Sequence, residues 1–305
     1  MTAQELIEMV DALEIPLKLI TNSRYAFTGL EAFCLLCAHF HSAGDMYSLS
    51  MLYDRTQSSI SEVINHLVLY LDEVWEHLLG CDQDHLLHPS ELARYADAIH
   101  QHGAPIKTIF SFIDCTIRRI AHPTWFQHQA YNGHKKFHAL KFQALMLPNG
   151  IIGDLYGLFE GHRNDNFLLS ESGLLECLAR FAHPEDLAAY APYEEQTYQI
   201  FGDPAYGVGP HIISPFAGMG DHTEEKTWNA EMSAVHIEVE HGFGVIANTW
   251  PFLNAGWKMR LYSSPVGRYY QVGVLLMNCI NCLQPNQVSQ YFNCLPPELD
   301  EYLHH

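Results

Sequence analysis

The order of predicted strands and helices after residue 108 constrains the fold of this chain most strongly. Residues 109–113 are an apolar run that predicts a strand. Residues 138–147 alternate between apolar and polar side chains, 148–150 (Pro-Asn-Gly) predict a turn, and 151–158 predict the returning strand. We therefore expect three strands in succession, the last two forming a hairpin.

A helix and further strands follow this hairpin. Residues 167–181 have apolar side chains at helical spacing, 199–201 predict a strand, and 211–213 can add a short one. Two long helices are expected at 224–249 and 266–282. This order favours an α/β fold with a ribonuclease-H-like mixed sheet flanked by helices, and we assign it to a domain covering residues 104–305.

The first 103 residues form the other predicted region, which is expected to be all helical. Thr28 and Glu31 have the spacing of a capping box before a helix at 32–41. A short helix at 49–53 and another at 60–71 follow.

Residues 51–71 resemble a helix-turn-helix, with Ser58 or Ser59 capping the second helix. An ordinary helical bundle is slightly preferred over it, because few basic residues lie nearby. In a helix-turn-helix, the residues facing the major groove would be Gln57, Ser58, Ser59 and Ser61.

The charge of the chain argues against autonomous, tight binding to DNA. Its 305 residues include 16 Lys and Arg against 35 Asp and Glu, a net charge of −19. Phosphate neutralisation needs Lys and Arg at the contact, and the field of so acidic a molecule repels DNA. No apolar run is long enough for a transmembrane helix, so we expect no membrane partner.

Eight cysteines raise the question of disulfides and zinc. The N-terminus lacks the pattern of a signal peptide, so we expect a reducing compartment and free thiols. Cys34-x-x-Cys37 and Cys279-x-x-Cys282 have zinc-like spacing, but both pairs lie in apolar, helical runs. Packing as small buried side chains is therefore preferred over a zinc site.

Three acidic residues stand where a divalent cation could be bound. Asp114 follows the apolar run 109–113, Asp203 follows 199–201, and Glu240 lies in the predicted helix 224–249. Carboxylates at the ends of neighbouring strands meet at one sheet edge, and a helical glutamate can complete the set. A pair of such ions hydrolyses phosphodiester bonds. For each acid taken alone, a cap or turn role is the alternative.

The surroundings of these acids resemble the PIF/Harbinger transposase-derived nucleases of the DDE endonuclease superfamily. The resemblance extends from Phe27 to Cys282 and rests on motifs in the family's order. These motifs are Phe112-Ile113-Asp114-Cys115-Thr116, residues 131–138 and 140–143, Gly161-His162-Arg163-Asn164-Asp165, Gly202-Asp203-Pro204-Ala205-Tyr206, Trp228-Asn229, Val239-Glu240 and Phe243-Gly244.

This resemblance implies a metal-dependent DNA endonuclease with an Asp-Asp-Glu triad and two Mg²⁺ or Mn²⁺ ions. Asp114, Asp203 and Glu240 would be both the catalytic acids and the metal ligands; Glu238 is the rival for the third position. Glu240 is preferred because Glu-x-x-Phe-Gly is the family's spacing. The accessory candidates are Asp165, whose alternative role is a helix cap, and the phosphate-facing Lys135, Lys136, Lys141 and Arg163, whose alternative is a solvated strand edge.

The resemblance also implies DNA as substrate, a Myb/SANT-like DNA-binding partner and a nuclear location, with the cytoplasm as the location without that partner. A homo-oligomer is a further expectation. The chain departs from the family in having few basic residues and in carrying His236 where an Arg is common. These departures support an alternative: a host-adopted adaptor, catalytically weak or inactive, that acts through protein partners. A metallohydrolase acting on another phosphoester is less favoured, because no His-Glu-x-x-His motif is present.

Overall fold

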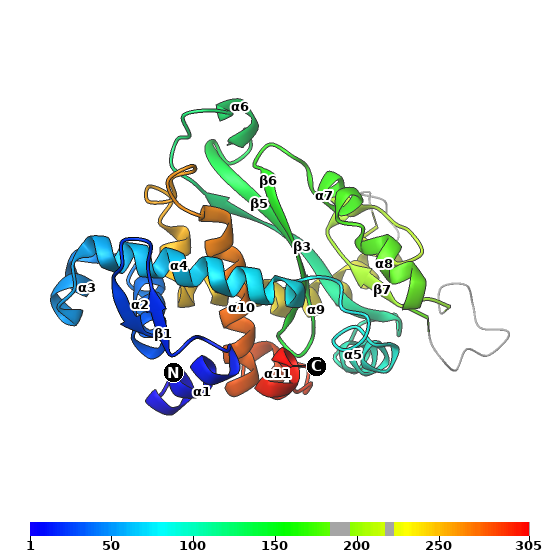
Figure 1. The fold of residues 1–305 in the computed structure, drawn as a ribbon. Helices are drawn as coiled ribbons and strands as arrows, with labels where there is room; N and C mark the ends of the chain where they lie inside the picture. Colours follow the sequence, from blue (N-terminus) through cyan, green and yellow to red (C-terminus); the bar gives the residue numbers. More distant parts are fainter. Residues whose placement is uncertain (184–195, 217–222, 305) are drawn as a thin grey trace.

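A mixed β-sheet with helices on both faces forms the centre of this computed structural model (Figure 1). The structure describes residues 1–183, 196–216 and 223–304, except for the side chains of residues 238–241 and 243. Its strands are β3 (Ile109–Arg119), β4 (Tyr131–Asn132), β5 (Phe137–Met146), β6 (Ile152–Glu160), β7 (Gln199–Phe201) and β8 (Ile212–Ile213). The hairpin and the two later strands predicted from the sequence are confirmed.

The strand pairing combines an antiparallel and a parallel half. Strands β4 and β6 both pair with β5, which pairs with β3. All three pairings are antiparallel. On the other side of β3, β7 and then β8 are added in parallel. Strand β3 is therefore central and belongs to both halves.

Alternation of side chains along β3 and β5 divides the sheet into two faces. Phe112 stacks on His236 of α9 (Thr223–Thr249), and Phe142 lies 4.6 Å from Tyr270 of α10 (Val266–Leu283), measured between ring centroids. Gln143, one position from Phe142, bonds instead to α7 (Asp165–Ser172). We call these two sides the α9 face and the α7 face.

The N-terminal region is not wholly helical, contrary to expectation. Residues between α1 and α2 form a two-stranded ribbon, in which Leu19 and Phe27 are buried while their strand neighbours are exposed. Alternation over only three residues per strand is too short to be distinguished from loop in the sequence. The elements of this region are α1 (Ala3–Ala12), β1 (Lys18–Ile20), β2 (Ala26–Thr28), α2 (Gly29–His41), α3 (Met46–Tyr53), α4 (Gln57–Trp75), η1 (Glu76–Leu79) and α5 (Pro89–Gln101).

The N-terminal helices share a hydrophobic core with the C-terminal ones. Phe40 of α2 contacts the rings of Trp250, which directly follows α9, and of Tyr269, which lies in α10. Helix α4 packs across α10, as Figure 1 shows. The buried apolar residues of both regions form one continuous cluster.

Two predicted helix boundaries differ from those in the structure: the start of α4 and the end of α7. Thr56, not Ser58 or Ser59, caps α4, and Ser59 is buried by its bonds to Thr56, so it cannot face a DNA groove. The helix expected at 167–181 is divided into α7 and α8 (Leu174–Phe181) at Gly173, whose φ of +66° ends the first helix. The Thr28 cap of α2 is confirmed.

The remaining elements complete both ends of the sheet. They are α6 (Gln127–Ala130), η3 (Pro204–Tyr206), η4 (Pro251–Asn254), α11 (Gln287–Tyr291) and α12 (Leu299–Leu303). Cys81 and Cys177 form a disulfide, so the expectation that all thiols are free was wrong for this pair. Within the ranges that the structure describes, no helix has the length and apolar character needed to cross a membrane.

Candidate active site

Asp114 lies in β3, and Asp203 follows the end of the neighbouring parallel strand β7. Phe112 of β3 pairs with Phe201 of β7, and each aspartate follows two residues later. Both phenylalanine rings lie 5.5 Å from the ring of His236 on α9. Side chains two positions apart share a face, so both aspartates belong to the α9 face. Because neighbouring strands lie about 4.8 Å apart, both aspartates come from the same junction of β3 and β7.

The environment of Gly202 also indicates that Asp203 belongs to the α9 face. A Cβ built on Gly202 would meet Ile113 and Tyr206, which lie toward the α7 face. Asp203, the next residue, has an extended backbone (φ −68°, ψ 170°), so its side chain emerges on the other side. The absence of a side chain at position 202 also lets the Tyr206 ring lie directly against β7.

Only one of the two aspartates ends a strand, which corrects the sequence-based expectation. Strand β3 continues to Arg119 because β5 pairs with it without interruption from Phe112 to Arg119. Asp114 is therefore inside its strand and half-buried, whereas Asp203 leaves β7 and begins the short helix η3. Beyond Phe112, β3 is still paired with β5, but its described pairing with β7 has ended. The loop that carries Asp203 begins at this end of β7.

Backbone amides orient both carboxylates. The Cys115 N–H donates to Asp114 Oδ1 at 2.7 Å, and the Ala205 N–H donates to Asp203 Oδ1 at 2.9 Å. Ser214 Oγ donates to the carbonyl oxygen of Asp203 at 2.8 Å, which ties the η3 loop to the residue after β8. The two acids are thus held by local backbone geometry and by the β7–β8 pairing.

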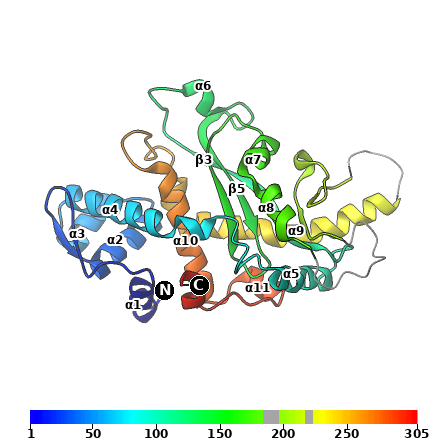
Figure 2. The ribbon, with the colours of Figure 1, turned by 45° about the vertical axis from the view of Figure 1, so that its right-hand side comes forward.

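Helix α9 crosses the face on which both aspartates lie (Figure 2). Trp228 contacts Phe201 of β7, His236 stacks on Phe112 of β3, and a Cβ on Gly242 would meet Met146 of β5. Glu240 therefore lies on the part of α9 that passes from β3 toward β5. The side chains of Glu238 and Glu240 lie outside the described residues, so the choice between them remains a prediction.

A family comparison now bears on this arrangement. The model of the DDE superfamily endonuclease family matches residues 113–278, more than half of the chain. The chain belongs to the DDE superfamily endonucleases. No curated protein and no solved structure matches it. The matched segment begins at the residue before Asp114 and includes Asp203 and Glu240.

Membership of the DDE endonucleases indicates a nuclease or transposase-derived function, and such enzymes normally use divalent metal ions. Among the residues that the structure describes, no three His, Cys, Asp or Glu side chains form a metal-binding group. Asp114 and Asp203 supply two oxygen ligands of the kind that Mg²⁺ and Mn²⁺ prefer. Their donor chemistry therefore fits such an ion.

The four basic candidates of this DDE endonuclease are not gathered around the acids. Lys135 and Lys136 are exposed near the tip of the β4–β5 connection, and Lys136 begins the turn into β5 with φ +58°. At 3.3 Å per residue, Lys136 lies about 26 Å along β5 from Ala144, the partner of Asp114. Arg163 pairs with Glu160 at 3.3 Å and covers the Phe167 ring.

Lys141 and Asp165 form an ion pair on the α7 face, opposite the aspartates. The Lys141 ammonium also donates to the Arg163 carbonyl at 3.1 Å, and the residue is only 5% exposed. It is therefore occupied inside the protein and is not available to a phosphate. Asn164, not Asp165, caps α7, so Asp165 serves here as the counter-ion of Lys141.

Cys115 and Tyr206 extend this buried polar group, and neither was identified as a contact from the sequence. The Tyr206 hydroxyl donates to Cys115 Sγ at 3.3 Å. Burial, and to a lesser degree the neighbouring acids, raise the pKa of the Tyr206 hydroxyl and of the Cys115 thiol, so both stay protonated. Tyr206 ends the Gly-Asp-Pro-Ala-Tyr motif, which was the signal that could have suggested it.

The two Cys-x-x-Cys pairs also behave as packing residues. Cys37 and Cys279 are buried, and burial raises the pKa of both thiols. Burial also raises the pKa of Cys282 to about 12. Zinc binds the thiolate, so these environments oppose a zinc site.

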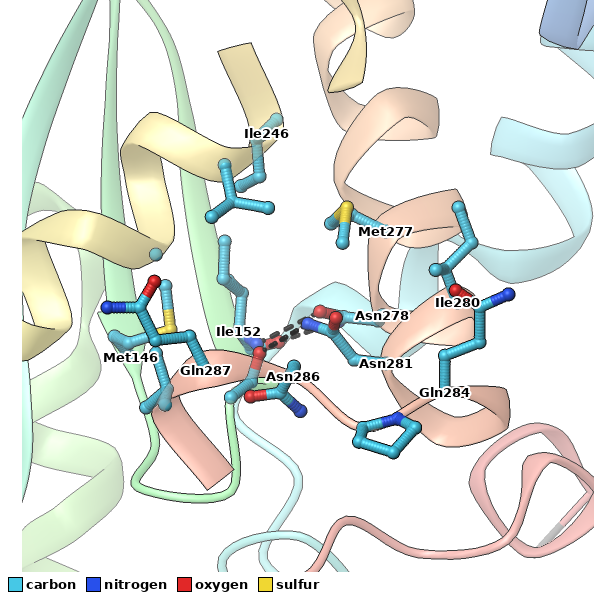
Figure 3. A pocket seen from close by; sticks show the side chains of 15 residues that line it. Met146, Ile152, Ile246, Met277, Asn278, Ile280, Asn281, Gln284, Asn286 and Gln287 are labelled. Carbon is cyan, nitrogen blue, oxygen red and sulfur yellow. Dashed lines mark hydrogen bonds between the residues drawn. The ribbon is translucent and has the colours of Figure 1, made fainter. Parts of the chain in front are cut away.

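A cavity of about 210 Å³ lies on the same face, beyond Met146 (Figure 3). Three asparagines along its wall hold the β5–β6 turn. The Asn278 side chain accepts from the Ile152 N–H and donates to the Ile152 carbonyl, both at 3.0 Å. Asn281 donates to the Gly150 carbonyl at 2.8 Å. Asn286 donates to the Asn149 carbonyl at 3.0 Å. These bonds anchor the hairpin to α10 and α11, which is a structural role.

Proposed function

We propose that this chain is a metal-dependent DNA endonuclease of the PIF/Harbinger group, with Asp114, Asp203 and Glu240 as its catalytic acids. The observation that carries the proposal is the register of Asp114 and Asp203 on one sheet face beneath α9. Two carboxylates so close repel one another when both are ionised, and a bound cation relieves that repulsion.

The sheet supports a ribonuclease-H-like assignment. Three successive antiparallel strands are followed by two that add in parallel beside the first. Asp114 lies in the first of these strands, Asp203 follows the fourth, and a long helix across the same face carries the glutamate. This is the arrangement that the resemblance leads one to expect for a triad of this kind.

The protein's own groups would hold and orient two Mg²⁺ or Mn²⁺ ions. Asp114 and Asp203 would bind them, and Glu240 would complete one site. The amides of Cys115 and Ala205 keep one oxygen of each aspartate in a fixed direction. When bound, such a pair of ions supplies an activated water and neutralises charge on the attacking and leaving oxygens.

The acidic surface supports dependence on a second protein. With a net charge of −19, the chain is suited to a basic, Myb/SANT-like partner that supplies DNA contact and entry into the nucleus. A homo-oligomer is compatible with the same proposal. A pull-down that recovers no basic DNA-binding protein, together with tight DNA binding by the chain alone, would contradict this part.

The experiment for the third acid is plasmid nicking in Mn²⁺ by Glu240→Gln and Glu238→Gln. These positions differ by two residues on one helix and point in different directions, so each is the matched control of the other. We expect Glu240→Gln to lose at least 100-fold in rate and Glu238→Gln to stay within a few-fold of wild type. Equal loss in both, or loss at Glu238 alone, would contradict the assignment.

A non-catalytic adaptor is the second candidate function, and the charge of the chain favours it. In that case the fold serves protein partnership, and the three acids would tolerate Asp→Asn or Glu→Gln changes. Partner capture that is unaffected by Asp203→Asn, with no cleavage by wild type in the partner's presence, would favour this candidate over the nuclease.

A further inference from the structure

The negative charge of the chain is unevenly distributed. Residues 115–153 and 241–297 contain no Asp or Glu, yet they carry half of the 16 basic residues. All 35 acidic residues therefore lie elsewhere in the sequence. The net charge of −19 does not describe the field near these two segments, because charges beyond about 10 Å are largely screened at physiological ionic strength.

The two acid-free segments meet in space beyond the end of β3. The Ala121 N–H donates to the Met259 carbonyl at 2.9 Å, and Arg118 Nη1 donates to Asn254 Oδ1 at 3.0 Å. A Cβ on Gly256 would lie 2.7 Å from Arg119 Cγ. In Figures 1 and 2 the orange loop before α10 lies beside the connection that leads into α6.

Large aromatic side chains are exposed where these segments meet. Trp125, Trp257 and Tyr262 are 62%, 69% and 60% exposed. Trp125 and Tyr262 come from different segments, and their ring centroids are 5.3 Å apart. Burying three such rings is favourable, so a ligand that covered them would gain binding free energy.

Exposed cations accompany these rings. Arg119 lies over the ring of Phe137, the neighbour of Lys136, and next to Gly256, while Arg260 lies between Trp257 and Tyr262 in sequence. In the part of the chain that the structure describes, none of these three cations forms an ion pair with an acid. We call Arg119, Trp125, Lys136, Trp257, Arg260 and Tyr262 the aromatic–basic face.

We propose that the aromatic–basic face binds single-stranded DNA. Its cations match the phosphates, and its exposed rings match unpaired bases, whose faces are accessible only outside a duplex. Arg119 follows Asp114 by five residues on β3, about 17 Å, so a strand leaving the acids can reach this face within a few nucleotides. The inference rests on the proposed nuclease function for the choice of DNA.

The test is fluorescence anisotropy with the full chain and a labelled 20-nucleotide single strand, in EDTA so that cleavage does not interfere. We expect the single strand to bind more tightly than the same sequence as a duplex. Trp125→Ala and Trp257→Ala should each weaken binding roughly 5- to 150-fold, and Trp125→Phe should restore most of it. The triple variant Arg119→Gln/Lys136→Gln/Arg260→Gln should reduce the slope of log K against log salt by about 2.

Matched controls lie outside the face. Lys18→Gln/Lys107→Gln removes two exposed cations, and Tyr47→Ala removes a ring that is 66% exposed. Both should bind the single strand like wild type. Equal losses in Tyr47→Ala and Trp125→Ala, or duplex binding as tight as single-strand binding, would overturn the proposal. So would unchanged DNA binding accompanied by loss of self-association, which would assign the face to a second copy of the chain.

Binding and cleavage can fail separately. Asp114→Asn/Asp203→Asn should retain single-strand binding in EDTA, because neither aspartate belongs to the face. Single-strand binding that depends on Trp125, without nicking by wild type, would support this inference and count against the nuclease. Nicking by wild type, with DNA binding unaffected in the variants of the aromatic–basic face, would support the nuclease and contradict this inference.

Discussion

Asp114 and Asp203 are 89 positions apart in sequence, yet each lies two residues beyond the paired Phe112 and Phe201 on adjacent parallel strands. The pairing of these strands, rather than any local motif, brings the two aspartates to the same junction of β3 and β7. His236 contacts both phenylalanine rings and so fixes α9 against the same two strands. The proposed cation site depends on this alignment.

A divalent cation should stabilise the folded chain through the two aspartates. At a Mn²⁺ concentration 100 times the Kd, the gain is about 2.7 kcal/mol, which should raise the melting temperature by a few degrees. Asp203→Asn should lose this gain, and without metal it should melt no lower than wild type, since a like-charge repulsion is removed. Differential scanning fluorimetry with and without Mn²⁺ measures both effects. The exposed Asp97→Asn is the control, and an equal Mn²⁺ response in both variants would contradict the site.

The Lys141–Asp165 pair should contribute to stability as a unit. Lys141 is almost fully buried and Asp165 largely so, and removing one partner of such a pair costs about 3 kcal/mol. A double-mutant cycle of Lys141→Met and Asp165→Asn, followed by urea unfolding, should give a coupling of about 1 to 3 kcal/mol. The more exposed Arg163–Glu160 pair is the control and should couple by less than about 1 kcal/mol. Coupling no larger than in this control would show that Lys141 is not held by Asp165.

Asp154 should make stability fall as pH rises. Burial raises its pKa from 3.8 to about 7, and its Oδ1 is buried without a hydrogen-bond partner among the described residues. Below pH 3.8 the carboxyl is neutral in both states; between about 4 and 7 only the unfolded chain ionises it, so stability is lost. Above pH 7 the loss is constant, on the order of 4 kcal/mol.

Asp154→Asn removes this ionisation without changing the shape of the side chain. The difference in unfolding free energy between the variant and wild type should therefore grow in favour of the variant from pH 4 to pH 7 and then level off. Urea unfolding at pH 4.5, 6 and 8 measures it. A difference that does not change with pH would show that the carboxyl is not kept neutral by burial.

The Cys81–Cys177 disulfide should be detectable by counting thiols. Protein denatured without reductant should react at six cysteines, and reduction should raise the count to eight. Because the bond closes a loop with a sequence separation of 96, its loss should cost up to about 4.7 kcal/mol on the chain-entropy account. Eight reactive thiols before reduction would instead match the reducing compartment expected for a nuclear protein.

Local patterns predicted most of the sheet because the hairpin strands alternate and are joined by a clear turn. The alternation at 138–147 and the Pro-Asn-Gly turn specify the β5–β6 hairpin without long-range information. The length of β3 could not be predicted in the same way. Residues after Ile113 are polar or half-buried, and only pairing with β5 extends the strand to Arg119.

The order of the acids could be predicted, but their surroundings could not. Spacing around Asp114 and Asp203 singled them out, whereas their shared face follows from strand register. Lys141 is a residue type that can bind phosphate, yet its partner Asp165 follows the β5–β6 hairpin in sequence and begins α7. The ribbon β1–β2, the Thr56 cap and the disulfide likewise depend on contacts that short patterns do not encode.

The most direct measurement is nicking of a supercoiled plasmid in Mn²⁺ by wild type and Asp203→Asn, with the Myb/SANT-like partner supplied in a parallel reaction. Asp→Asn removes the charge with little change in shape, so a folded variant isolates the carboxylate. The proposed nuclease function predicts nicking by wild type and a loss of at least 100-fold in the variant. Equal nicking by both proteins, or none by wild type even with the partner present, would contradict it.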